Sequence, residues 1–235
     1  MNMSYQRSFA FGAIFVLVLC SSVGQAQLLP IFDWVRSFFG NYEEPPYQLV
    51  ANLSDTIEER IYPAKRWACT EQFLTPKAKD TKRSEMFMSL FAYIQGKNDG
   101  EQKIDMTVPV TTKVDHRNGD LYSYEMCFFI PQEFQANPPR PENRNVRVVS
   151  FPELHVYSIR YGGYSTQELE QEQMTLLTTT LKNASIPYFE ENQGPRATYF
   201  VSGYDSPTKF WSRRNEVWVL GKDNKPLPTH VPSVD

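Results

Sequence analysis

An internal repeat constrains the fold of this chain more than any other feature of its sequence. The dipeptide Tyr62-Pro63 matches Phe151-Pro152 at a shift of 89 residues, and the same shift places Phe87 on Leu176. Each copy reads as strand, strand, helix and strand, and one copy alone would leave a sheet face and a helix stripe exposed. Pairing the copies buries both surfaces. We therefore predict an α+β fold, a pseudo-twofold distorted antiparallel β-barrel with two main helices packed on it.

Hydrophobic periodicity and turn residues define the expected elements. Alternating apolar residues predict strands at 47–52, 57–62, 65–72, 103–114, 121–130, 146–151, 155–161, 199–204 and 215–220. Helical spacing predicts helices at 84–95 and 165–183. We expect Ser84 and Gly96 to cap the first helix, and Ser165 with Glu168 to form a capping box at the start of the second.

The N-terminus has the three parts of a cleavable secretory signal. Arg7 supplies positive charge, an apolar run covers 9–19, and the small residues Gly24 and Ala26 suit a peptidase site. The apolar run is too short to span a bilayer, although an uncleaved anchor is the alternative. We expect a signal peptide at 1–26 and a protein that is secreted or resides in the lumen of the secretory pathway.

Three further segments follow the signal. Residues 27–46 combine a short amphipathic helix, at 28–39, with a Pro-rich linker. That helix could dock on its own domain, on a partner or on a membrane. Residues 47–222 form one domain of two diverged repeats, and 223–235 read as a flexible tail. No membrane span is expected after cleavage.

The cysteines and two sequons fit an exported protein. Cys20 leaves with the signal, so Cys69 and Cys127 remain. In an oxidising compartment they could form a disulfide, or they could stay as two buried thiols, and sequence alone leaves both open. The triplets at Asn52 and Asn183 are candidate N-glycosylation sites.

Composition and motifs argue against several function classes. A net charge of −3 without a basic run gives no general attraction to nucleic acid. The chain carries no nucleophile elbow, P-loop or dinucleotide fingerprint, and no His/Cys cluster with zinc spacing. The three histidines, His116, His155 and His230, are far apart, so neither a catalytic residue nor a metal ligand can be assigned.

The predicted helix 84–95 is more apolar than one packing stripe requires. It carries Met86, Phe87, Met88 and Phe91 among other large side chains. Such a helix is either buried on most sides or lines an apolar pocket, and methionine adapts to flat ligands. Core packing and ligand binding both remain possible at this point.

Several motifs, in one order along the chain, resemble the SOUL/heme-binding protein family. They are Tyr93-Ile94-Gln95-Gly96-Lys97-Asn98, Lys103-Ile104-Asp105-Met106-Thr107-Val108-Pro109-Val110, Asn137-Pro138-Pro139-Arg140-Pro141, Gly203-Tyr204-Asp205-Ser206-Pro207 and Arg213-Arg214-Asn215-Glu216-Val217-Trp218. The similarity covers about residues 36–222. It implies a pseudo-twofold α+β barrel and non-enzymatic binding of heme or related tetrapyrroles in an apolar groove beside the first helix.

The resemblance carries over to individual positions only in part. Some members have a histidine, proposed as an iron ligand, directly before the tyrosine that matches Tyr62; here that residue is Ile61, so a heme would be bound without this axial ligand. The groove residues implied are Met86, Phe87, Met88 and Phe91, and the basic residues that could meet propionates are Lys82, Arg83 and Lys97.

The sequence thus predicts a secreted, monomeric, non-enzymatic protein whose partner is heme or another porphyrin. The alternative is a cofactor-free interaction module that binds a peptide, a protein or a membrane surface.

Overall fold

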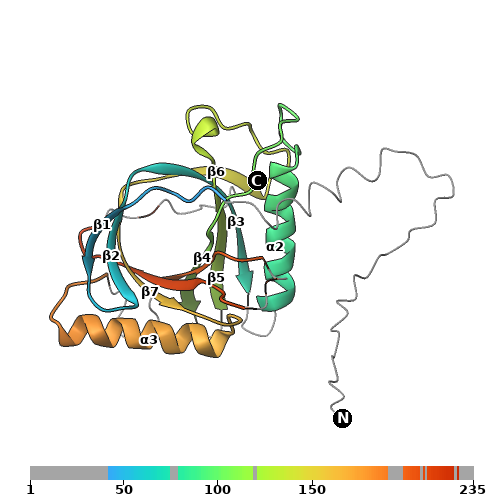
Figure 1. Cartoon of the computed structure of the whole chain (residues 1–235). Coiled ribbons are helices and arrows are strands. Elements are labelled where there is room, and N and C mark those ends of the chain that lie inside the picture. Colours follow the sequence, from blue (N-terminus) through green and yellow to red (C-terminus); the bar gives the residue numbers. More distant parts are fainter. Residues whose placement is uncertain are drawn as a thin grey trace, which may run out of the picture. The chain divides into compact units, whose positions relative to one another are not determined.

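Figure 1 shows a computed structural model of the chain. The structure describes residues 42–74, 79–118, 121–189, 198–206, 209, 211–224 and 227. All of them belong to the unit Asn41–Asp235. The predicted signal peptide at 1–26, the predicted helix at 28–39 and most of the predicted tail lie outside the described residues.

The described elements follow the predicted order. The strands are β1 Gln48–Asn52, β2 Ile57–Tyr62, β3 Lys65–Leu74, β4 Val110–Asn118, β5 Leu121–Phe129, β6 Val146–Phe151, β7 Leu154–Tyr161, β8 Tyr199–Gly203 and β9 Asn215–Leu220. The helices are α2 Lys79–Ile94 and α3 Gln167–Asn183, with a short 3-10 helix, η3, at Gln132–Phe134. Each predicted strand and helix therefore has a counterpart.

Three predicted boundaries were wrong by four residues or more. Helix α2 begins at Lys79, five residues before the expected start. The strand expected over 103–114 begins only at Val110 and continues to Asn118. The preceding residues instead pack back on the end of α2, where the Ile104 amide donates to the Ile94 carbonyl at 2.8 Å, and Thr107 bridges to Glu43.

The strands form one antiparallel sheet with internal symmetry. Its order is β1-β2-β7-β9-β8-β4-β5-β3-β6. The unit β2-β3-α2-β4-β5 is followed by the matching unit β6-β7-α3-β8-β9. If each strand is replaced by its counterpart in the other unit, the sheet order from β2 to β6 is read in reverse, as a twofold axis requires. The registers agree, because Tyr62 pairs with Leu154 as Phe151 pairs with Lys65. The pseudo-twofold fold is confirmed, and each repeat has four strands rather than three. The sheet is not closed, since β1 and β6 are its edges.

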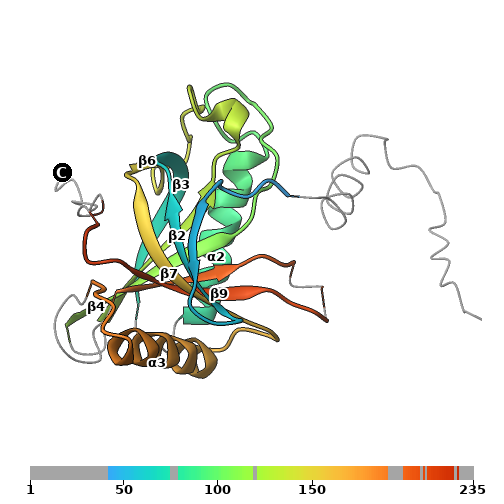
Figure 2. The same ribbon diagram turned by 60° about the vertical axis from the view of Figure 1, so that its left-hand side comes forward.

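The two faces of the sheet carry two separate cores. Side chains alternate along a strand, so on β9 Val217 and Val219 face one side while Trp218 and Leu220 face the other. The first side packs against both helices, which lie outside the curled sheet in Figure 1 and in the turned view of Figure 2. The second lines the inside of the curl with Tyr62, Trp67, Cys69, Cys127, Phe129, Val149, Phe151, Leu154, Val156, Phe200, Trp218 and Leu220.

The two remaining cysteines meet inside the curl. Cys69 on β3 lies directly opposite Cys127 on β5. Their Cα atoms are 4.1 Å apart and their Sγ atoms, at 2.13 Å, form a disulfide. Both residues are buried. The strand register therefore supplies the proximity that the sequence alone left open.

The predicted caps hold only at the C-terminal end of α2. Because α2 begins at Lys79, Ser84 lies within the helix and is not its N-cap. After α2, Gly96 has φ of 104° and the Lys97 amide donates to the Ala92 carbonyl, so glycine fits the left-handed cap. At α3 the N-cap is Thr166, whose side chain accepts from the Leu169 amide, instead of Ser165. No helix among the described residues is long and apolar enough to cross a membrane.

Candidate functional site

Helix α2 presents one face to the core and another outward. Met86, Leu90, Tyr93 and Ile94 recur at helical spacing and are at most 3% exposed. They pack against the sheet face that β3 and β5 supply. The Tyr93 hydroxyl also donates to the Pro139 carbonyl at 2.9 Å, which ties the helix to the Pro-rich loop. This stripe fixes which side chains of α2 can meet a ligand.

The four apolar groove candidates divide between these faces. Met86 is 1% exposed and belongs to the core, whereas Met88 is 58% exposed. Phe87 and Phe91 are half-buried and stacked, with ring centroids 5.9 Å apart and an interplanar angle of 14°. Phe87 also meets the buried ring of Phe128 edge-on at 5.3 Å. The outward apolar surface of α2 is therefore formed by Phe87, Met88 and Phe91, and we call these three residues the α2 surface.

The three basic candidates have different partners. Lys82 pairs with Glu85 at 2.7 Å on the exposed side of the helix. Arg83 pairs with Glu170 of α3 at 3.1 Å. Lys97 follows the helix and is exposed. Lys82 and Lys97 are thus accessible to an anion, while Arg83 already neutralises a buried carboxylate.

Glu170 is a buried carboxylate that the sequence did not reveal. It is fully buried, and its Oε1 accepts from Arg83 and from the Ser165 hydroxyl at 2.9 Å. Ser165 also hydrogen-bonds the Tyr161 hydroxyl at 2.8 Å, which explains why Ser165 does not cap α3. Burial, with the nearby charge of Glu170, raises the pKa of Tyr161 to about 12. This cluster connects α2 to α3 on the sheet face that both helices cover.

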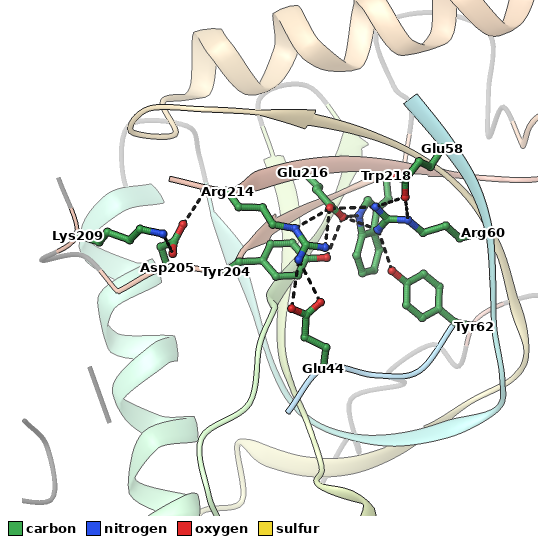
Figure 3. A network of polar contacts seen from close by, with 10 residues as sticks. All are labelled: Glu44, Glu58, Arg60, Tyr62, Tyr204, Asp205, Lys209, Arg214, Glu216 and Trp218. Carbon is green, nitrogen blue, oxygen red and sulfur yellow. Dashed lines mark hydrogen bonds and ion pairs between the residues drawn. The ribbon is translucent and has the colours of Figure 1, made fainter. Parts of the chain in front are cut away.

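A second buried carboxylate, Glu216, lies inside the curl (Figure 3). It accepts from Arg60 at 2.8 and 3.1 Å and from Arg214 at 3.1 and 3.0 Å. The Tyr204 hydroxyl and the Trp218 indole N–H donate to it at 2.8 and 2.7 Å. Burial would raise the pKa of Glu216, but the hydrogen bonds and charge of Arg60, with the charge of Arg214, outweigh burial and lower it.

This network extends to the surface through two ion pairs whose carboxylates are partly exposed. Arg214 contacts Glu44 at 3.1 Å, and Arg60 contacts Glu58 at 2.7 Å. Arg214 also lies 3.6 Å over the ring of Tyr204. The charged run 213–216 ends in Glu216, which is completely buried. The network joins β2, β9 and the segment before β1, which is a structural role.

His155 is the histidine whose side chain the structure describes. Its Nδ1 lies 2.8 Å from Asp223 and its Nε2 lies 2.7 Å from Glu59. Burial would lower the pKa of His155, but these two carboxylates raise it. Asn224 also bonds the His155 backbone. The first two residues of the predicted tail are therefore held against β7.

The remaining site predictions concern metals and modification. Within the described residues, Cys69, Glu125 and Cys127 are the group that places three metal-type ligand atoms within 4.8 Å of one another. Glu125 and Cys127 are neighbours on one face of β5, but Cys69 joins them only through strand pairing, which the sequence does not reveal. The two sequon residues, Asn52 and Asn183, are both exposed.

Comparison with known proteins finds related sequences over most of this chain. Residues 42–220 match the family model described as SOUL heme-binding protein. Heme-binding protein 1 of Mus musculus is 32% identical over 79% of this chain and 96% of its own length. Heme-binding protein 2 of Homo sapiens is 33% identical over 72% and 79%, respectively. Among solved structures, the C-terminal domain of EcmrR aligns with a TM-score of 0.49 and 11% identity, over 74% of this chain and 96% of that chain. The family model and the two relatives cover most of the chain, and the chain therefore belongs to the SOUL heme-binding protein family.

Proposed function

We propose that this chain is a secreted, non-enzymatic, monomeric protein that binds heme or a related tetrapyrrole on the α2 surface. Its family and the names of its relatives support the ligand class. The observation that carries the location is the stacked pair Phe87–Phe91 beside the exposed thioether of Met88. Met86 backs this surface from within the core.

A porphyrin is flat, apolar over its ring and anionic at its propionates. The α2 surface offers half-buried aromatic rings for the macrocycle, and aromatic contacts contribute beyond the area they bury. Lys82 and Lys97 lie near opposite ends of α2, and both propionates leave one edge of a porphyrin, so one of these lysines, not both, would meet them. Arg83 contributes less in this proposal, because leaving Glu170 would break an ion pair to a buried carboxylate.

Iron ligation by histidine is not part of the proposal. The position matched to the histidine of some relatives is Ile61, and both ring nitrogens of His155 are engaged by carboxylates. Affinity then comes from buried apolar area and propionate pairing. A micromolar dissociation constant corresponds to about −8 kcal/mol. At roughly 25 cal/mol per Å², a few hundred Å² of buried porphyrin supplies that before association costs. We expect micromolar-class binding that admits more than one porphyrin.

The test is a hemin titration of the mature protein, followed by the Soret band. Met88→Glu places a negative charge on the α2 surface and should weaken binding about tenfold or more, a change of about 1.4 kcal/mol. The matched control is Leu176→Glu on α3, whose side chain is likewise half exposed, at 50%. Both variants should keep wild-type stability. A saturable shift in all three proteins with equal affinity would place the ligand elsewhere, and no saturable shift at tens of micromolar would refute the ligand class.

Export is the second part of the proposal. A disulfide inside the sheet and two exposed sequons support it. Expression of the full chain in a secretory cell should release a protein that begins near Gln27 and loses mass on deglycosylation. Retention of residues 1–26 in a cell-associated protein would contradict it.

A further inference from the structure

The two cysteines form part of a larger group of metal-type side chains inside the curl. Cys69 and Glu71 lie two residues apart on β3, so both side chains face the same side of the sheet. On β5, Cys127 is paired with Cys69 and Glu125 with Glu71. The four residues occupy the corners of a rectangle on adjacent strands, with two sulfurs at one end and two carboxylates at the other.

These side chains are close together and protected from solvent. The ligand atoms of Cys69, Cys127 and Glu125 all lie within 4.8 Å of one another. Cys69 and Cys127 are at most 2% exposed, the side chain of Glu125 is 2% exposed, and that of Glu71 is 8% exposed. The second carboxylate oxygen of Glu71 has no hydrogen-bond partner, and Arg147 Nη2 lies 3.9 Å from it. A buried carboxylate oxygen without a hydrogen bond is costly unless a cation satisfies it.

The charges around this group show what a metal would displace. Lys113 pairs with Asp115 at 3.1 Å and lies 3.6 Å from Glu125, and Arg147 pairs directly with Glu125. A metal at this position would therefore replace a cation that Glu125 already contacts. Reduction of the disulfide would add two thiols that can ionise.

We propose that reduction of the Cys69–Cys127 disulfide creates a buried site for a thiophilic divalent cation of the zinc class, with Cys69, Cys127 and Glu125 as ligands and Glu71 as the fourth. Structural zinc sites are closed and four-coordinate, thiolates are preferred zinc ligands, and Asp or Glu oxygens also bind zinc. The oxidised protein lacks thiolates and does not form the site. Arg147, whose side chain is 27% exposed, leaves Glu125 when the metal binds.

The chemistry balances in two steps. A phosphine reductant and one water convert the disulfide to two thiols, and the phosphine becomes its oxide. The two thiols then bind one divalent cation as thiolates and release two protons. Metal affinity of the reduced protein should therefore rise with pH. The site is separate from the α2 surface and faces the opposite side of the sheet, so it does not depend on heme binding.

The test uses the mature protein reduced with a phosphine and titrated with Co²⁺ under anaerobic conditions. The reduced wild type should bind one Co²⁺ and show a thiolate-to-cobalt charge-transfer band, and Zn²⁺ should abolish that band. Glu125→Gln should weaken binding more than about 100-fold, beyond the roughly 10–100-fold cost of losing an outer-shell partner. The Cys69→Ser/Cys127→Ser double variant should show no band. Glu58→Gln removes a carboxylate from β2 on the same sheet face and should bind as the wild type does.

Three results would overturn the proposal. One is a reduced, folded protein without the cobalt band. Another is equal binding by the oxidised protein, and the third is wild-type affinity in Glu125→Gln. If reduction unfolds the chain, Zn²⁺ should restore the native near-ultraviolet circular dichroism of the wild type but not of the double serine variant. Failure of Zn²⁺ to restore it would equally refute the site.

Discussion

The buried Glu216 network allows one stability prediction to be worked out in detail. The carboxylate of Glu216 accepts hydrogen bonds from four side chains: two guanidinium groups (Arg60 and Arg214), one phenol (Tyr204) and one indole (Trp218). Replacing it with glutamine keeps the size but removes the charge and one acceptor, and turns an N–H group toward other donors. Arg60, 3% exposed, then becomes a buried cation without its main partner.

The expected loss follows from that geometry. Removing one member of a buried ion pair costs about 3–5 kcal/mol. For a domain of this size, each kcal/mol lowers the melting temperature by about 2–4 °C, so Glu216→Gln should melt about 6–20 °C lower. The matched control is Glu44→Gln, since Glu44 also pairs with Arg214 but is 41% exposed. It should cost less than about 1 kcal/mol.

Urea unfolding followed by tryptophan fluorescence measures both variants. The midpoint of Glu216→Gln should fall while the denaturant slope stays constant, because the same surface is exposed on unfolding. The reasoning is refuted if Glu216→Gln stays within about 1 kcal/mol of the wild type. It is equally refuted if Glu44→Gln is as damaging as Glu216→Gln.

Three further predictions concern pH and helix docking. The folded-state pKa of Glu216 lies below its ordinary value of 4.5, so the stability that ionised Glu216 contributes is complete above pH 4.5 and is lost as pH falls through the folded-state pKa. In acid, the urea midpoint of the wild type should therefore fall more steeply with pH than that of Glu216→Gln. Equal pH slopes would contradict this. The folded-state pKa of His155 lies above 6.5, so the stability that protonated His155 contributes is complete below pH 6.5 and is lost as pH rises through the folded-state pKa. His155→Gln should remove that decline from the profile of urea midpoint against pH. An unchanged profile would show that the two carboxylate partners of His155 do not act through charge. Arg83→Gln removes the ion pair between Arg83 and the buried Glu170, and calorimetry should show a loss of about 3–5 kcal/mol in the free energy of unfolding. Lys82→Gln removes an exposed ion pair and should cost less than about 1 kcal/mol. Equal costs would argue against the α2–α3 connection.

The fold was predictable because its determinants are local or repeated. Alternation marks the strands, helical spacing marks α2 and α3, and Gly96 ends α2 as its type predicts. The 89-residue shift carried the pseudo-twofold arrangement, which the sheet order confirms. The start of β4 at Val110 was missed because the preceding segment is held against the end of α2, as the hydrogen bond between Ile104 and Ile94 shows. The structure offers no such explanation for the start of α2 at Lys79.

The candidate site was predictable only in part. Helical phase separates Met86, in line with buried Leu90, from Met88 on the opposite side, and this signal was already present in the sequence. The buried carboxylates had no such signal. Arg83 pairs with Glu170, 87 residues away in the sequence, and the partners in the Glu216 network are up to 156 residues apart in the sequence. Charge pairs of this kind are set by strand order and helix docking, which local spacing does not encode.

The most direct test of the account is the absorption spectrum of the protein purified from its natural source without added ligand. If the chain is a secreted tetrapyrrole carrier of micromolar affinity, a porphyrin Soret band should co-purify at partial occupancy, and mass spectrometry of the extract should identify the macrocycle. Added hemin should increase that band to saturation at one ligand per chain. A spectrum with no porphyrin band, together with no saturable response to hemin, would contradict the central claim.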